Sequence, residues 1–302
     1  MTSIDGAATP ESTEIEGDVI DASTVIVCCG SGGVGKTTVS AALALAAARR
    51  GQHRGRIARV ADRPSAPAAH GVRMKVVLFD IDGTLLRTEG AGRRAMEQAL
   101  RLAYGTIGDP GYRYDGKTDR QIVREQMRAA GLSDAVIDPR LDLVLDLYVS
   151  HLTTDLERNP SQAIPCAGIT PLLARLAASQ QVTLGLLTGN IERGARAKLQ
   201  AIDLAFDQFR ANAFGCDHEV RAELPAVARA RAQALLGHDI AGEQLVIIGD
   251  TPADIHCGRA LNVRAIGVAT GRFGVDELAS HDPAAVFPSL VDTDAVLEAI
   301  LA

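Results

Sequence analysis

The chain has 302 residues, of which 47% are hydrophobic and 23% are charged, a balance that excludes a mainly disordered or fibrous protein. Its 31 basic and 37 acidic residues give a net charge of −6, so the chain as a whole offers no basic field for a nucleic-acid backbone. Aromatic residues make up 3% and Trp is absent, so platforms for stacking bases are scarce. We therefore expect no nucleic-acid partner.

The first 73 residues divide into three segments. Residues 1–22 are polar, acidic and without periodicity, which predicts a disordered tail that lacks the features of a signal peptide. Residues 23–51 predict a strand, a glycine loop and an Ala/Leu-rich helix. The apolar run of that helix is far shorter than the ~20 residues that cross a bilayer, so we expect no membrane partner. Residues 52–73 are rich in Arg, Ala and Pro and are predicted to be a linker.

The glycine loop Gly30-Ser-Gly-Gly-Val-Gly-Lys-Thr37 fits the phosphate-binding pattern G-x-x-x-x-G-K-[ST] between a predicted strand and helix. With Cys28-Cys29 before it, the loop resembles the start of an arsenite-pump-type ATPase. The candidate nucleotide-binding residues are Gly30, Gly35, Lys36 and Thr37. Residues 23–73 are too few for the parallel sheet and second acidic strand of such an ATPase, so we expect an incomplete P-loop segment that does not hydrolyse ATP.

From residue 74 onward, short apolar runs alternate with helical segments. The runs are 75–79, 182–187, 245–248, 263–268 and, more weakly, 285–287. Such runs, separated by helices, are typical of parallel strands that are buried on both faces. The sequence therefore predicts an α/β fold with a doubly wound parallel sheet, formed by 74–87 and 165–302, and a helical cap inserted at 88–164.

Acidic and polar side chains follow three of these runs. Asp80-Ile-Asp82-Gly83-Thr84 follows the first, Thr188-Gly189-Asn190 the second, and Gly249-Asp250-Thr-Pro-Ala-Asp254 the third. Because ligands of open α/β sheets bind at the carboxyl ends of the strands, we expect these groups to meet at one edge. Isolated Asp residues usually belong to turns or helix caps, but four acids behind two apolar runs favour a shared site.

The three motifs, in this order and spacing, resemble those of the haloacid dehalogenase-like (HAD) hydrolase superfamily over residues 74–302. The resemblance implies a Rossmannoid core, Mg²⁺ as cofactor and a small phosphorylated metabolite as substrate. Dehalogenating members lack an acid at the second motif position, so Asp82 favours phosphate chemistry over carbon–halogen cleavage.

The resemblance also implies roles for individual residues. Asp80 is expected to be the nucleophile that forms an aspartyl-phosphate, and Asp82 the general acid and base. Asp80, the carbonyl of Asp82 and Asp250 would bind the metal, with Asp254 in support. Thr188 and the amide of Gly189 would hold the phosphoryl oxygens, with Asn190 beside them.

The family normally places a Lys or Arg between its second and final motifs, to tie the nucleophile to the phosphate. No lysine follows Lys198 in this chain, and Lys198 lies about ten residues past Thr188, a position that we interpret as wrong for this role. We expect Arg221, just before a predicted helix, to take it, because Arg binds phosphate through two parallel hydrogen bonds. Arg229 falls in mid-helix and is the weaker candidate.

The insert 88–164 resembles the cap of the phosphoglycolate-phosphatase-like branch. Its turn Tyr114-Asp-Gly-Lys-Thr-Asp119 precedes a predicted helix, and the corresponding loop of related enzymes contacts the leaving group. Lys117, Thr118 and Asp119 are therefore candidate substrate-binding residues. A plain helix cap would also explain Thr118 or Asp119, and the two interpretations stay open.

The sequence thus predicts a Mg²⁺-dependent phosphomonoester hydrolase, a monomer or homodimer, with phosphoglycolate as the leading candidate substrate. One alternative is a β-phosphoglucomutase-type phosphomutase, which shares the cap and the motifs. The other is a nucleotide-binding or ATPase-related protein that acts through the N-terminal loop. The five cysteines, odd in number and without metal-ligand spacing, predict reduced thiols and a cytoplasmic location.

Overall fold

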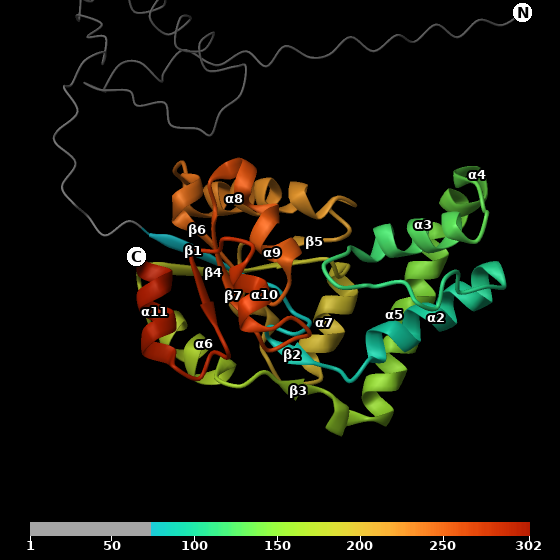
Figure 1. Ribbon diagram of the computed structural model, residues 1–302, viewed down its shortest axis with the longest axis horizontal. Helices are drawn as coiled ribbons and strands as arrows, with labels where there is room; N and C mark the ends of the chain where they lie inside the picture. The colour runs from blue at the N-terminus through green and yellow to red at the C-terminus, as the bar shows by residue number, and fades with distance from the viewer. Residues whose placement is uncertain (1–73) are drawn as a thin grey trace, which may run out of the picture. The chain divides into compact units, whose positions relative to one another are not determined.

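The computed structural model describes residues 74–302. The predicted tail, the P-loop segment with Gly30, Gly35, Lys36 and Thr37, and the predicted linker lie outside the described residues. Within 74–302, a parallel six-stranded sheet has the order β5-β4-β1-β6-β7-β8 (Figure 1). Its strands are β1 (Lys75–Phe79), β4 (Val182–Thr188), β5 (Ala213–Phe214), β6 (Leu245–Gly249), β7 (Arg264–Val268) and β8 (Ala285–Phe287).

Helices cover both faces of this sheet. Successive strand residues point to opposite faces, so each strand packs against helices on both sides. The helices of this core are α6 (Ile169–Ala177), α7 (Glu192–Gln200), α8 (Leu224–Leu236), α9 (Pro252–Cys257), α10 (Val275–Ala279) and α11 (Thr293–Leu301). In β1, Val77 and Phe79 pack in one apolar cluster with helices α6, α7 and α11, and Val76 and Leu78 pack in another with α8 and α9. The predicted doubly wound α/β fold is confirmed.

The predicted strands agree with β1, β4, β6, β7 and β8 to within one residue at each end. The edge strand β5 was not predicted, because two residues are too short for a recognisable apolar run. A separate two-stranded antiparallel ribbon of β2 (Leu86–Arg87) and β3 (Ile164–Pro165) was not predicted either.

Four helices lie between β2 and β3 in the chain and form the cap. They are α2 (Ala91–Tyr104), α3 (Asp119–Ala129), α4 (Asp134–Ile137) and α5 (Leu141–Arg158), grouped together in Figure 1. The cap has its own apolar centre, which includes Met96, Leu100 and Tyr148. Ile191, the residue before α7, packs into this centre, so the cap rests on the core next to the end of β4.

Cys166, Cys216 and Cys257 are free thiols. None of the helices between residues 74 and 302 combines the length and the apolar character needed to span a membrane.

Candidate active site

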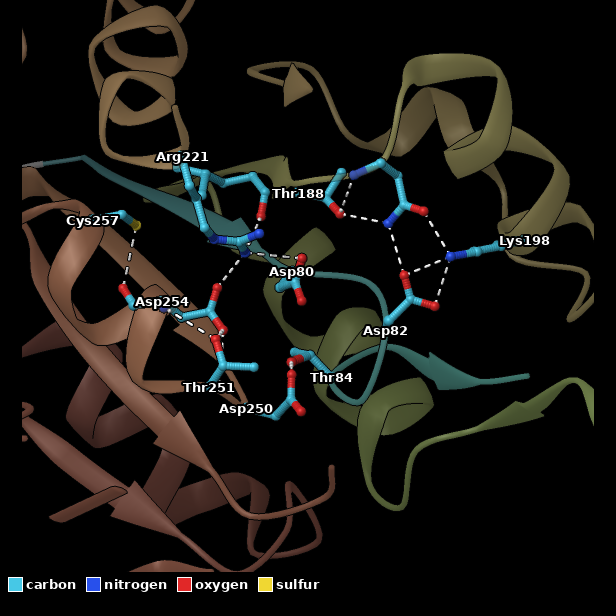
Figure 2. A network of polar contacts seen from close by, with 12 residues as sticks. Asp80, Asp82, Thr84, Thr188, Lys198, Arg221, Asp250, Thr251, Asp254 and Cys257 are labelled. Atoms are coloured by element: carbon cyan, nitrogen blue, oxygen red, sulfur yellow. Dashed lines mark hydrogen bonds and ion pairs between the residues drawn. The ribbon is translucent and has the colours of Figure 1, made fainter. Parts of the chain in front are cut away.

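The three polar motifs meet at the carboxyl ends of β4, β1 and β6. The sheet order puts β1 between the other two strands. Thr188 is the last residue of β4, and Asp80 and Asp250 directly follow β1 and β6, so all three lie at the ends of adjacent strands. They line a cleft of about 520 Å³, which cap residues such as Tyr114 and Tyr148 also line. The predicted convergence of the motifs is therefore present in the structure (Figure 2).

Asp80, Asp250 and Asp254 form a tight, buried acidic cluster. Each offers one carboxylate oxygen, and these oxygens all lie within 4.8 Å of one another. Burial raises the pKa of Asp80 to about 6, although the charge of Arg221 opposes this shift. Burial, with the charges of Asp254 and Asp80, raises the pKa of Asp250 well above its usual value. Crowded carboxylates of this kind fit a divalent cation, and their hard oxygens suit Mg²⁺.

The backbone conformation at residue 83 explains why a glycine follows the second acid of the first motif. Its φ of +81° lies in the left-handed region, where a side chain would be strained. A Cβ atom at this position would also stand 2.3 Å from the Asp250 carboxylate oxygen. The backbone can therefore wrap around Asp250 only where position 83 carries no side chain.

Arg221 bridges two acids of this cluster, Asp80 and Asp254. Its guanidinium lies 3.1 Å from Asp80 Oδ1 and donates a hydrogen bond to Asp254 Oδ1. Thr251 donates to the other oxygen of Asp254, through its backbone N–H at 3.0 Å and its hydroxyl at 2.7 Å. Because both Asp254 oxygens are already engaged, Asp254 holds Arg221 and the turn before α9 in place, and Asp80 and Asp250 have more capacity left for a metal.

Arg229, the weaker candidate for the cation beside the nucleophile, lies elsewhere. Its Nε donates to the carbonyl of Ile240 at 2.6 Å, and it lines a separate depression near Gln244. Arg221, at the start of a short 3-10 turn before α8, is the arginine of the two that reaches Asp80.

A second polar network surrounds Asp82, and sequence reasoning missed its main member, Lys198. The Lys198 ammonium lies 2.6 and 2.8 Å from the two oxygens of Asp82 and donates to Asn190 Oδ1 at 2.6 Å (Figure 2). Asn190 Nδ2 donates both to Asp82 Oδ2 and to Thr188 Oγ1, each at 2.8 Å. Lys198 was interpreted as badly placed for tying the nucleophile to the phosphate, and its ammonium contacts Asp82 and not Asp80. Its place in the cleft, beside Asp82, was not predicted.

The signal that identifies Lys198 is its place on the buried face of α7. Gly194, Ala195, Lys198 and Leu199 are the buried residues of this helix. A lysine in such a row is unusual, because lysines are almost never fully buried unless they are paired. The helical spacing of these four residues therefore marks Lys198 as a buried lysine, although it does not say which group the ammonium contacts.

The cap turn 116–119 docks on the loop after β4. Asp119 N–H donates to the carbonyl of Gly189 at 2.9 Å, and Asp119 Oδ2 accepts from the Ile191 N–H at 2.8 Å. A Cβ atom at Gly189 would stand 1.9 Å from the Lys117 carbonyl oxygen, so this close approach requires glycine. Asp119 is buried, and burial raises its pKa to about 7.

The three candidate residues of this turn have different surroundings. Thr118 is fully buried and caps α3, since its Oγ1 accepts from the Gln121 N–H at 3.2 Å and donates to the Glu219 carbonyl at 2.7 Å. Lys117 and Asp119 line the cleft, and Lys117 forms an ion pair with Glu125 at 3.2 Å.

The cleft is also lined by cationic and aromatic side chains. Three residues of the cap that line the cleft carry these groups, and they are Arg93, Arg113 and Tyr112. Arg87 of β2 and Arg272 of the core line the same cleft. An anionic or polar small molecule suits this lining better than an apolar one.

The chain matches known proteins over the region that carries this site. The sequence model of the haloacid dehalogenase-like hydrolases matches residues 74–262. The N-acetylmuramic acid 6-phosphate phosphatase of Pseudomonas aeruginosa is 29% identical over 218 residues, which cover 70% of this chain and 88% of that protein.

Solved structures show the same fold. A hydrolase from Pseudomonas syringae has a TM-score of 0.58 at 19% identity, covering 76% of this chain and 100% of its own. CbbY from Rhodobacter sphaeroides, in complex with phosphate, has a TM-score of 0.56 at 19% identity, covering 72% of this chain and 96% of its own. At such identities the likeness bears on the fold alone.

Proposed function

Because the chain belongs to the haloacid dehalogenase-like hydrolase family, we propose that it is a Mg²⁺-dependent phosphatase that hydrolyses a small phosphomonoester through an aspartyl-phosphate. The observation that carries the proposal is the cluster of Asp80, Asp250 and Asp254, with Arg221 at 3.1 Å from Asp80. The proposal also keeps the protein a cytoplasmic monomer or homodimer with a small phosphorylated metabolite as its partner.

In the first step, the Asp80 carboxylate attacks phosphorus in line and the ester oxygen leaves with a proton from Asp82. Thr188 Oγ1 accepts hydrogen bonds from Asn190, so its own hydroxyl proton is left to donate to a phosphoryl oxygen. In the second step, water attacks phosphorus and passes a proton to Asp82. The Asp80–phosphorus bond breaks, and inorganic phosphate is released.

Asp80 and Asp250, with the carbonyl of Asp82, would hold the Mg²⁺. When bound, the ion supplies positive charge that screens the carboxylates from the anionic substrate. Arg221 supplies further positive charge from the protein itself, since it lies against Asp80 and is buried. Asp254 fixes Arg221 through their hydrogen bond.

The substrate is a small phosphorylated metabolite with a polar alcohol part. The cleft, at about 520 Å³, has the size of a pocket for one small molecule. Its cationic and aromatic lining supports phosphoglycolate, the leading candidate from the sequence. The relative from Pseudomonas aeruginosa is named for a sugar phosphate, so sugar phosphates are also candidate substrates to be tested.

A screen of phosphate release tests the proposal. The full chain is incubated with Mg²⁺ and a panel of phosphoglycolate, hexose, amino-sugar and nucleotide monophosphates, and inorganic phosphate is measured. We expect release from one class of monoester, loss of release with a chelator, and return with Mg²⁺. Absence of release from every member contradicts the proposal.

Two further measurements, of sugar-phosphate isomerisation and of nucleotide binding, separate the two alternatives. Isomerisation of a hexose phosphate without release of phosphate favours the phosphomutase. Nucleotide binding that is lost in Lys36→Ala, in a chain that releases no phosphate, favours the protein that acts through its N-terminal loop.

A further inference from the structure

Lys198 is a buried cation whose partners all belong to the candidate active site. Its side chain is 4% exposed, whereas that of Asp82 is 45% exposed and opens to the cleft. The ammonium contacts both Asp82 oxygens and Asn190 Oδ1 at 2.6–2.8 Å. A lysine ammonium has three donors, so these contacts account for its full capacity.

The ammonium of Lys198 lies close to the cap. Gly92 of α2 lies opposite, and a Cβ atom there would stand 3.3 Å from Nζ. The same hypothetical atom would lie 3.9 Å from the Tyr148 hydroxyl. The side chain of Lys198 therefore reaches from α7 to the cap helix α2, and its ammonium contacts Asp82.

Stability alone does not account for such a pair. Removing a lysine from water costs several kcal/mol, and a buried ion pair often recovers no more than this cost. Asp82 is also half-exposed and would be solvated without a partner. The pair is therefore better explained by the position in which it holds the Asp82 carboxylate.

The network extends from Lys198 to the residue that would hold the phosphoryl group. Asn190 accepts from Lys198 through Oδ1 and donates to both Asp82 and Thr188 through Nδ2. The position of the Asp82 carboxylate is thereby fixed relative to Thr188. An ammonium that donates to both oxygens fixes where those oxygens lie, and therefore where Asp82 meets the water that attacks the aspartyl-phosphate.

We propose that Lys198 is a positioning residue that holds the Asp82 carboxylate ready to accept the proton of the hydrolytic water. The inference rests on the proposed function. In this step the water oxygen bonds to phosphorus, one water proton moves to Asp82, and the bond between phosphorus and Asp80 breaks. The electron pair of that bond returns to the Asp80 carboxylate, and hydrogen phosphate leaves.

The test is the steady-state and burst kinetics of Lys198→Met on p-nitrophenyl phosphate, with the full chain and Mg²⁺. The p-nitrophenolate group leaves without needing a proton from Asp82, so the variant should form the aspartyl-phosphate at the normal rate. Hydrolysis of the aspartyl-phosphate, which needs Asp82 as proton acceptor, should be slower. We expect kcat to fall by about 10- to 100-fold and KM to fall in parallel. A burst of p-nitrophenolate should then precede the slow phase.

This pattern differs from that of a structural defect. Loss of folded enzyme lowers kcat and leaves KM unchanged, because KM does not depend on the enzyme concentration. Arg196→Met is the matched control, since it removes an exposed charge of the same helix that pairs with Glu192, and its constants should equal those of the wild type. If Lys198→Met does not fold, Lys198→Gln replaces it, because glutamine keeps a hydrogen-bond donor. Its kcat and KM should fall in parallel, by smaller factors, and a burst should again precede the slow phase.

Three results overturn the inference. They are wild-type kinetics in Lys198→Met, a lower kcat with unchanged KM and no burst, and a folded variant that releases no p-nitrophenolate at all. A wild-type chain without Mg²⁺-dependent turnover of any monoester contradicts the proposed function instead, so the two failures are distinguishable.

Discussion

The guanidinium of Arg221 lies 3.1 Å from the carboxylate of Asp80, and both side chains are buried. The pair joins the 3-10 turn before α8 to the residue that follows β1, and these two segments lie far apart in the sequence. Arg221 also donates to Asp254, so it compensates two buried negative charges at once.

Arg221→Met should therefore reduce both activity and stability. Breaking a buried ion pair leaves uncompensated charge, and the free energy of unfolding should fall by about 3–5 kcal/mol in metal-free protein. Phosphate release should fall by at least about 100-fold, which is the scale of one lost charge-stabilising donor. Denaturant unfolding and phosphate release measure the two effects. A change of activity below about threefold would turn attention to Lys117.

Mg²⁺ should stabilise the folded chain through Asp80 and Asp250. At a Mg²⁺ concentration 100 times its Kd, binding adds about 2.7 kcal/mol to the free energy of unfolding. Asp250→Asn removes one ligand charge and should lose most of this gain, as measured by thermal unfolding with Mg²⁺ and with chelator. Asp276→Asn, an exposed acid of α10, should keep the full gain. An equal gain in both variants would place the ion elsewhere.

Asp119 should make stability depend on pH between about 4 and 7. Burial raises its folded pKa to about 7, although Lys198 and the Ile191 N–H oppose the shift and Asp82 adds to it. A raised folded pKa gives stability that is present below the unfolded pKa and is lost as pH rises through the folded pKa.

Asp119→Asn keeps an acceptor for the Ile191 N–H and removes this charge. Relative to the wild type, its free energy of unfolding should rise by about 1–3 kcal/mol between pH 5 and pH 8. Chemical denaturation at the two pH values measures this difference. A variant that shows the wild-type pH dependence would contradict a buried, weakly acidic Asp119.

Gly189→Ala should disturb the docking of the cap. The new Cβ would stand 1.9 Å from the Lys117 carbonyl oxygen, so the turn 116–119 must move away from the core. We expect KM for the substrate to rise by about tenfold or more, because lids of this kind complete the site. Gly274→Ala is the control, since no atom lies within 4 Å of its Cβ position. Equal KM values in the two variants would contradict the role of this contact.

The sequence was sufficient to predict most of the core, for a physical reason. Strands such as β1 and β6 are continuous apolar runs that end in acids, and parallel strands buried on both faces produce this pattern. The end of each run also marks the carboxyl edge, so the convergence of Asp80, Thr188 and Asp250 followed from topology. The strand β5 lacks such a pattern because it has only two residues.

Contacts that depend on how helices pack were harder to predict from the sequence. Lys198 reaches Asp82 only because α7 packs between the sheet and the cap, and residue spacing along the chain does not encode that distance. Thr118 has a capping pattern in the sequence, and its second bond to the Glu219 carbonyl comes from a residue about a hundred positions away. Both are tertiary contacts that local periodicity does not define.

The central claim, that Asp80 is the nucleophile, is tested most directly by trapping the phosphorylated enzyme. Wild-type protein and Asp80→Asn are mixed with Mg²⁺ and substrate, quenched with borohydride, which reduces an acyl phosphate, and digested for mass spectrometry. The account predicts substrate-dependent conversion of Asp80 to homoserine in the wild type, and neither trapping nor turnover in a folded Asp80→Asn. Full turnover by Asp80→Asn, or trapping at another carboxylate, would contradict it.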